Sequence, residues 1–282
     1  SAPTATAMTV SSGATLEFSA GTFSMSANTA VSGNGALEFG DTSANAGAYI
    51  VTKCLATNGP VVINNAALTI GCGALQTFHE LRLNHPAAIL QGSAQFAVSS
   101  ALQWPLGRIR GNGSPAATIT INNGATATWG NPGLIDPRVL DQRDYINLGT
   151  TTVSSFSNQS VLNDGARVVN AAAGIFNLDQ SGGPGVWLAI GLGSQQFLNQ
   201  GTLNVVNGRS SFYTTFTNTG SVFVENGFFS ASSRGELVLH GPGNDTGSYT
   251  VAELGYLRVS EPTALRALSG SGSISGEGQL QV

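Results

Sequence analysis

The sequence predicts an all-β solenoid, in which coils of roughly 20 residues stack along one axis and helix content is very low. Three observations predict it: a doubled phrase, a row of phenylalanines at the same spacing, and an unusual composition. The phrase is F-L-N-Q-G-T-L-N-V-V-N-G at 197–208, and it recurs as F-T-N-T-G-S-V-F-V-E-N-G at 216–227. Such a repeat is typical of proteins whose neighbouring coils share one core.

The composition favours short strands joined by tight turns. Of the 282 residues, 41% are hydrophobic and only 9% are charged, against about 25% charged residues in ordinary globular proteins. Glycine is abundant, at 37 residues, and the net charge is only −4. Disordered chains combine low hydrophobicity with high net charge, so disorder does not fit. The single lysine, Lys53, and the lack of a basic cluster argue against nucleic acid as a partner.

Short alternating strands are expected from the start of the chain. T-L-E-F (15–18) and A-L-E-F (36–39) place Leu and Phe on one face and Glu on the other. The longest strongly apolar run, 185–193, is too short to cross a bilayer, so no membrane span is expected. Further short strands are expected at 68–70, 81–83, 119–121, 237–239, 257–259 and 280–282.

The central part of the chain repeats most regularly. Four phenylalanines recur there at nearly constant intervals, each close to the predicted coil length: Phe156, Phe176, Phe197 and Phe216. If each interval is one coil, these rings form a structural stack inside the solenoid. Asn158, Asn199 and Asn218 then occupy equivalent turn positions, where Asn tolerates a left-handed backbone. The alternative is a β-sandwich, whose turns follow one another every 8–12 residues without a shared longer phrase.

Two regions break the pattern, and both are expected to be irregular loop insertions in a single β-helix domain spanning 1–282. The region 104–147 carries seven charges and four prolines, and proline is excluded from interior strands. The region 241–247, G-P-G-N-D-T-G, is a second turn-rich excursion. Because loops on a regular scaffold commonly carry function, the first region is where a site is expected.

Cys54 and Cys72 are the only cysteines. Their separation in the sequence is about one coil of the predicted solenoid, which brings their Cα atoms within bridging range. A disulfide there would imply an oxidising compartment; the alternative is two buried free thiols. Two cysteines without paired histidines do not make a structural zinc site, and neither a metal nor another cofactor is expected.

The charged region offers candidates for two kinds of site. Glycosidases use two carboxylates that flank the bond they cleave, so Asp141 and Asp144 are the catalytic candidates if the protein is an enzyme. Neighbouring arginines make local salt bridges the simpler interpretation.

A ligand-binding site is the second possibility. Trp104 and Trp129 could stack on a sugar ring, with Arg138 and Arg143 beside them, or the two tryptophans could cap the core.

Two further sequence patterns could indicate other functions. His79, Arg82 and His85 in F-H-E-L-R-L-N-H (78–85) include a possible base for a polysaccharide lyase. Strand parity places His79 with the inward leucines, however, so the cluster does not converge. Thr126 and Thr128 resemble the threonine pairs of ice-binding faces, but the pair is not expected to recur at the coil period.

The motifs F-x-N-x-G-[TS]-[LV]-x-V and S-G-x-G-x-L-x-[FV], the latter at 32–39 and 275–282, resemble the coils of right-handed parallel β-helices. They are similar to those of bacterial autotransporter passengers and filamentous haemagglutinin-like adhesins. The resemblance implies a single-stranded right-handed parallel β-helix, secreted or on the cell surface. Its expected role is that of a structural or adhesive module, a stiff spacer that binds a glycan or surface protein through its loops.

The same architecture also occurs in carbohydrate-active enzymes, so a polysaccharide lyase or glycoside hydrolase is the alternative. No catalytic motif of those enzymes can be matched in the sequence. The final motif stops in mid-pattern, and a bare final coil exposes unpaired strand edges. We therefore expect a fragment or protomer of a longer assembly, with end-to-end self-association.

Overall fold

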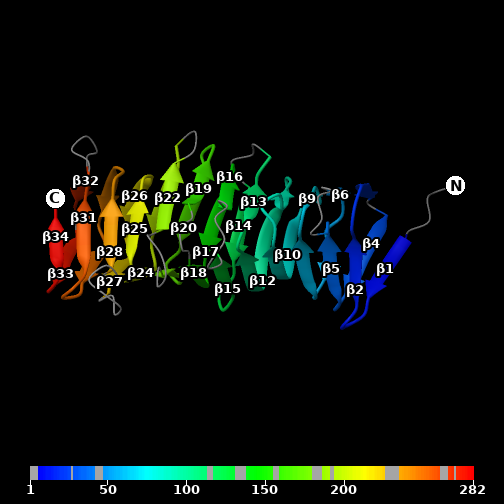
Figure 1. The fold of residues 1–282 in the computed structure, drawn as a ribbon, viewed down its shortest axis with the longest axis horizontal. Helices are drawn as coiled ribbons and strands as arrows, with labels where there is room; N and C mark the ends of the chain where they lie inside the picture. Colours follow the sequence, from blue (N-terminus) through cyan, green and yellow to red (C-terminus); the bar gives the residue numbers. More distant parts are fainter. Residues whose placement is uncertain are drawn as a thin grey trace.

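The computed structural model describes residues 6–26, 28–41, 47–112, 117–130, 138–154, 159–179, 186–190, 194–225, 235–260, 266–269 and 271–282. These residues form 34 β-strands and no helix. The strands follow one another along an elongated body, from β1 near the N-terminus to β34 at the C-terminus (Figure 1). Every strand pairing among them is parallel, and the predicted all-β solenoid is confirmed.

Each coil contributes strands to three sheets. Sheet I contains β1 (Thr6–Val10), β4 (Thr29–Gly33), β7 (Ala56–Thr57), the first halves of β10 (Leu75–Leu83) and β12 (Gln95–Trp104), β14 (Thr118–Ile121), β17 (Asp144–Asn147), β20 (Arg167–Asn170), β23 (Gln196–Asn199), β26 (Thr215–Asn218), β29 (Gly243–Asp245) and β32 (Arg266–Leu268). Sheet II contains β2 (Thr15–Phe18), β5 (Ala36–Phe39), β8 (Pro60–Ile63), the second halves of β10 and β12, β15 (Thr126–Trp129), β18 (Thr150–Ser154), β21 (Ile175–Asp179), β24 (Thr202–Asn207), β27 (Ser221–Val224), β30 (Ser248–Val251) and β33 (Ser273–Gly276). Sheet III is an unbroken ladder of 12 strands: β3 (Thr22–Met25), β6 (Gly47–Val51), β9 (Ala66–Ile70), β11 (Ile89–Gln91), β13 (Gly107–Arg110), β16 (Arg138–Asp141), β19 (Gln159–Asn163), β22 (Val186–Ile190), β25 (Arg209–Phe212), β28 (Glu236–Leu239), β31 (Tyr256–Val259) and β34 (Gln279–Gln281).

The coils are longer and more variable than predicted. Asn199 and its partner Asn218 on the next coil are 19 positions apart in the sequence. Asn177 and its partner Asn204 are 27 positions apart. The average is about 23 residues per turn, against the predicted length of roughly 20. Most paired strands hold a constant register, with shifts in β10 and at the end of β21. The segments between the sheets absorb most of the difference in length.

The core is a thin column of inward-facing side chains. Phe176 and Phe197 are fully buried with ring centroids 5.1 Å apart, and Phe216 follows Phe197 at 5.5 Å. The fourth predicted member of the stack, Phe156, lies outside the described residues. Trp129 extends the stack in the other direction, 5.6 Å from Phe176.

A second buried row runs beside the aromatic stack. It consists of the last residues of β17, β20, β23 and β26: Asn147, Asn170, Asn199 and Asn218. Along this row, each side-chain nitrogen donates to the Oδ1 atom of the next asparagine at 2.8 Å. Each nitrogen also donates to a backbone carbonyl, as Asn170 does to Thr202 at 2.9 Å. All four side chains are completely buried, whereas Asn158, the third asparagine named by the sequence pattern, lies outside the described residues.

In the regions 104–147 and 241–247, where irregular loops are expected, the described residues form strands, whereas 113–116 and 131–137 lie outside the described residues. The first region contains β13, β14, β15, β16 and β17, which pair with neighbouring coils in regular register. The second contains β29, which pairs with β32. Pro105 lies between β12 and β13, where no ladder bond is lost. The charged residues fit because their partners lie on adjacent coils, as described below.

Candidate functional site

The two tryptophans, for which stacking on a sugar and capping the core were the alternatives, lie in the core. Trp104 and Trp129 are each only 1% exposed, and their ring centroids are 5.1 Å apart. The indole nitrogen of Trp104 donates to the carbonyl of Gly107 at 3.3 Å. Because neither ring face reaches the surface, these side chains take the alternative role, that of core residues continuing the phenylalanine stack.

Arg143 is also buried, and its guanidinium joins consecutive coils. It donates to the carbonyls of Gly92 at 2.8 Å, Ala94 at 3.0 Å and Thr118 at 2.7 Å, and more weakly to that of Arg110 at 3.3 Å. Its guanidinium carbon lies 4.0 Å from the ring centre of Phe96, a cation–π contact. Burial lowers the pKa of Arg143 to about 10. These contacts make Arg143 an internal tie between strands and leave no face for a ligand.

Arg138 has a similar position at the start of β16. It is 1% exposed, and its Nε and Nη2 atoms both donate to Ser160 Oγ at 3.3 Å. Burial lowers its pKa to about 10 as well. The predicted ligand-binding pair of arginines is therefore placed inside the coil, where it supports the neighbouring strands.

The two candidate catalytic carboxylates belong to different sheets. Asp141 ends β16 in sheet III, with its Oδ2 atom 3.3 Å from Arg110 Nε and 3.7 Å from Arg108 Nη1. Asp144 begins β17 in sheet I and forms an ion pair with Arg167, whose Nε lies 3.1 Å from Oδ1. Each carboxylate thus has its own guanidinium partner, in keeping with the simpler interpretation of these residues as local ion pairs.

The histidine cluster is spread over the end of β10. The register of β10 shifts between Phe78 and Glu80, where the strand turns from sheet I to sheet II. This shift corrects the parity argument: Phe78 and Leu81 both point inward, and His79 is exposed. Arg82 forms an ion pair with Glu80 at 2.6 Å.

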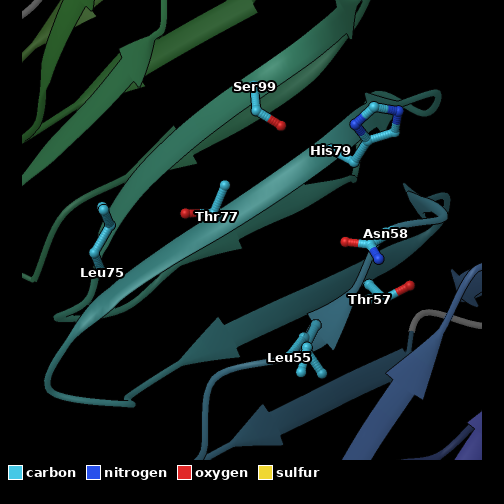
Figure 2. A pocket seen from close by; sticks show the side chains of 8 residues that line it. Leu55, Thr57, Asn58, Leu75, Thr77, His79 and Ser99 are labelled. Carbon is cyan, nitrogen blue, oxygen red and sulfur yellow. The ribbon is translucent and has the colours of Figure 1, made fainter.

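A polar trough lies beside His79, where sheet I is interrupted (Figure 2). The two-residue strand β7 pairs with β4 but forms no ladder with β10, and another break in sheet I lies between β26 and β29. The volume of the trough is about 350 Å³, and it is lined by Leu55, Ala56, Thr57, Asn58, Leu75, Thr77, His79 and Ser99.

Two side-chain bridges cross the interruption in sheet I. Gln76 replaces part of the missing ladder, because its amide accepts from the backbone nitrogen of Leu55 at 2.7 Å and donates to the Leu55 carbonyl at 3.0 Å. The predicted disulfide is the second bridge: Cys54 and Cys72 are bonded, with their Cα atoms 5.1 Å apart.

A second hollow lies at the corner between sheets III and I. Its volume is about 310 Å³, and it is lined by Thr69, Gln91, Gly92, Arg110, Gly111, Asn112 and Gln142. Gln142 has a left-handed backbone, with φ of 53°, which is uncommon for a residue other than glycine.

The exposed arginines Arg108 and Arg110 were not among the predicted site residues. The alternating R-I-R of 108–110 was their only signal in the sequence.

The threonine pairs recur once, which corrects the expectation that they would not. Thr126 and Thr128 are in register with Thr150 and Thr152 on the next coil. The coil after that places Ile175 beside Thr150, so this array of paired hydroxyls ends after two coils.

Within the described residues, no group of three or more His, Cys, Asp or Glu side chains is placed to hold a metal ion. The same part of the chain contains no helix that is long and apolar enough to cross a membrane. No protein-family model, curated protein or solved structure matches the chain. The β-solenoid is therefore assigned from the structure, and the resemblance to surface adhesins is an expectation from the sequence motifs alone.

Proposed function

We propose that the protein is an extracellular or cell-surface β-solenoid, which acts as a stiff spacer and adhesive module and binds a glycan or a surface protein through its sides. The proposal rests on buried polar side chains that join successive coils through hydrogen bonds. The asparagine row joins four successive coils, and Arg143 joins its own coil to carbonyls in β13 and β14 and next to β12. Such bonds supply stiffness along the axis.

Stiffness follows from geometry. Bending a solenoid separates the coils on the outer side of the bend, which stretches the ladder bonds of at least one sheet. In this chain the bend would also stretch the asparagine row, whose members are completely buried. A buried amide that loses its partner costs about 1–3 kcal/mol, so bending is resisted at every coil of the row.

An extracellular location is supported by the Cys54–Cys72 disulfide, since disulfides persist in oxidising compartments. The composition also suits an exposed surface module. With 9% charged residues, much of the outer surface consists of hydroxyl and amide side chains, which can form hydrogen bonds to sugars or peptides in many directions.

We also propose that the chain assembles end to end, with a second copy of the chain covering the C-terminal coil. In the C-terminal coil, Ile274 is 41% and Leu280 is 49% exposed. Their partners one coil earlier, Tyr249 and Leu257, are each 2% exposed. An apolar hollow of about 170 Å³ opens at this end. Sedimentation of the 282-residue chain over a range of concentrations should show dimers, and Leu280→Asp should weaken them.

Small-angle scattering and adhesion assays test the main proposal together. Twelve strands in sheet III at about 4.8 Å spacing give a rod of about 50 Å per copy. At concentrations below those that give dimers, the scattering curve should fit a rigid rod of this length. Beads coated with the protein should adhere to glycan- or protein-coated surfaces. A flexible or collapsed particle would contradict the spacer role. Failure to adhere to any surface would contradict the adhesive role.

A further inference from the structure

The coils around β13 and β16 carry positive charge on an otherwise acidic chain. The net charge of the whole chain is −4. The segment 104–147 holds four arginines against three aspartates, a local balance of +1. Arg138 and Arg143 are buried there, so Arg108 and Arg110 are the two that reach solvent. An anionic group is therefore the ligand that this surface attracts.

The two exposed arginines are held side by side by one carboxylate. They alternate with the buried Ile109 on β13, so both project from the outer face of sheet III. Asp141 on the neighbouring strand contacts both, through a single oxygen, and its side chain is only 5% exposed. The arginine side chains remain 40% and 44% exposed. Among these three side chains, one negative charge thus orients two guanidinium groups, so that two positive charges face one negative charge.

The guanidinium of Arg110 is accessible to solvent. Its Nε atom lies 3.3 Å from Asp141 Oδ2, and 44% of its side chain is exposed. A guanidinium offers two parallel N–H groups to a carboxylate, which makes such a pair both stronger and more specific than a single bond. The exposed guanidinium of Arg110 therefore suits a carboxylate ligand.

The hollow beside Arg110 has the size and chemistry for one sugar ring. Its volume of about 310 Å³ is at the lower end of the range of about 300–1,000 Å³ for small-ligand pockets. Its described lining contains hydroxyl, amide, guanidinium and glycine groups but no aliphatic or aromatic side chain. Gln91 is oriented by donating to Thr69 Oγ1 at 3.0 Å. Such a lining favours a polyhydroxylated ligand over an apolar peptide side chain.

The neighbouring coils exclude a polyanion as the preferred ligand. On the outer face of sheet III, the row that leads to Arg110 consists of Ile50, Thr69 and Gln91, and Asn163 follows Asp141. These four positions are all neutral. Nucleic acids and heavily sulfated glycans bind through cations repeated at their charge spacing, which this row does not supply. A single acidic group flanked by neutral sugars fits the row.

We propose that Arg108, Arg110 and the adjoining hollow bind a hexuronic acid residue within an otherwise neutral glycan. The carboxylate of the sugar lies against the guanidinium groups, and its ring hydroxyls face the amides of Gln91 and Gln142. Asp141 is a positioning residue, because it holds the arginines in place. This inference rests on the proposed adhesive function and names the ligand class and site.

The test uses the full chain and matched pairs of trisaccharides. Each pair has a central glucuronic, galacturonic or mannuronic acid in one member and the carboxyl-reduced neutral sugar in the other. Calorimetry should show that the chain prefers the acidic member of at least one pair. Arg110→Gln should weaken that binding about 10- to 100-fold, as expected for loss of a charged hydrogen bond. The control is Arg209→Gln, an equally exposed arginine that pairs with Glu236 in the same sheet, and it should change the affinity less than about twofold.

Several outcomes would overturn the inference. They are equal affinity for the acidic and reduced sugars, an unchanged affinity in Arg110→Gln, and the absence of binding to any of the acidic trisaccharides. Preferential binding of heparin or of an Asp/Glu-rich peptide would equally overturn it. Circular dichroism checks the folding of each variant, and Gln91→Ala gives a second variant, which should weaken both members of the preferred pair. Because scattering measures the rod independently, loss of this site leaves the spacer proposal standing.

Discussion

The contribution of an asparagine to the free energy of unfolding depends on whether its side chain lies inside or outside the coil. Asn170 accepts from Asn147 and donates to Asn199, both at 2.8 Å, and all three side chains are completely buried. Asn170→Ala leaves a donor of Asn147 and the Oδ1 atom of Asn199 without these partners. We expect the free energy of unfolding to fall by about 2–3 kcal/mol, because buried polar groups without partners are costly. Urea unfolding measures the change.

Asn177→Ala is the matched control on the outer face. Asn177 accepts from Asn204, also at 2.8 Å, but it is only partly buried. Water can replace the lost bond, so the expected cost is below about 1 kcal/mol. Equal costs for the two substitutions would show that the buried row adds nothing beyond an ordinary surface amide pair.

Tyr145 makes the fold sensitive to alkali. Its hydroxyl is within 2.7 Å of Thr151 Oγ1, and burial raises the pKa of Tyr145 above its ordinary value of about 10. A folded pKa above the unfolded one gives stability that is present below about pH 10 and is lost as pH rises further. The phenolate absorbance of Tyr145 should therefore appear only with unfolding. Tyr145→Phe should lower stability near neutral pH and flatten its decline above about pH 10. Ionisation of Tyr145 in the folded chain near its ordinary pKa would contradict this.

At the scale of elements, the corner after β16 depends on one arginine. Arg143 reaches the carbonyls of Gly92, Ala94 and Thr118 with N–H groups that are fixed in one plane. Lysine keeps the charge but cannot reproduce that fork. Arg143→Lys should lower the free energy of unfolding by about 2 kcal/mol or more. Arg167→Lys is the control, because Arg167 is 49% exposed in its pair with Asp144, and it should cost less than about 1 kcal/mol. Similar losses in both variants would contradict the role of Arg143 as a tie.

The strand elements and their stacking are readable from the sequence because side-chain alternation and the repeated phrase report burial directly. The pairing of Cys54 with Cys72 follows from the same period. The corners between the sheets are harder to predict from the sequence. Charge and proline content at 104–147 suggested loops, but Arg138 and Arg143 are buried. A sequence does not distinguish a solvated arginine from one that satisfies backbone carbonyls.

The candidate site was less accessible to prediction than the fold. The surface arginines Arg108 and Arg110 acquire their arrangement from Asp141, which lies on another coil. That contact depends on a coil length that varies from turn to turn, so sequence spacing alone does not locate it. The same limit applies to His79, whose exposure is set by a register shift within β10.

At the scale of the whole molecule, the buried hydrogen bonds and ring contacts between coils are distributed unevenly. The asparagine row extends from β17 to β26, and the aromatic stack extends from the end of β12 to β26. At the far end, every residue of β33 and β34 is exposed or partly exposed. In a solenoid, stability is close to a sum of coil and neighbour contributions, so such differences persist locally.

Hydrogen exchange should reveal this distribution in the full chain. Amides of β20, β23 and β24 should exchange slowest, because their coils are tied by both buried rows. In chain dilute enough to be monomeric, amides of β33 and β34 should exchange first, since opening that coil exposes little apolar surface that is not already exposed. Asn170→Ala should speed exchange in β17, β20 and β23 while leaving β5 and β8 unchanged, because the effect passes through neighbours only. Uniform protection along the chain, or a uniform loss in the variant, would mean that the solenoid opens as one cooperative unit.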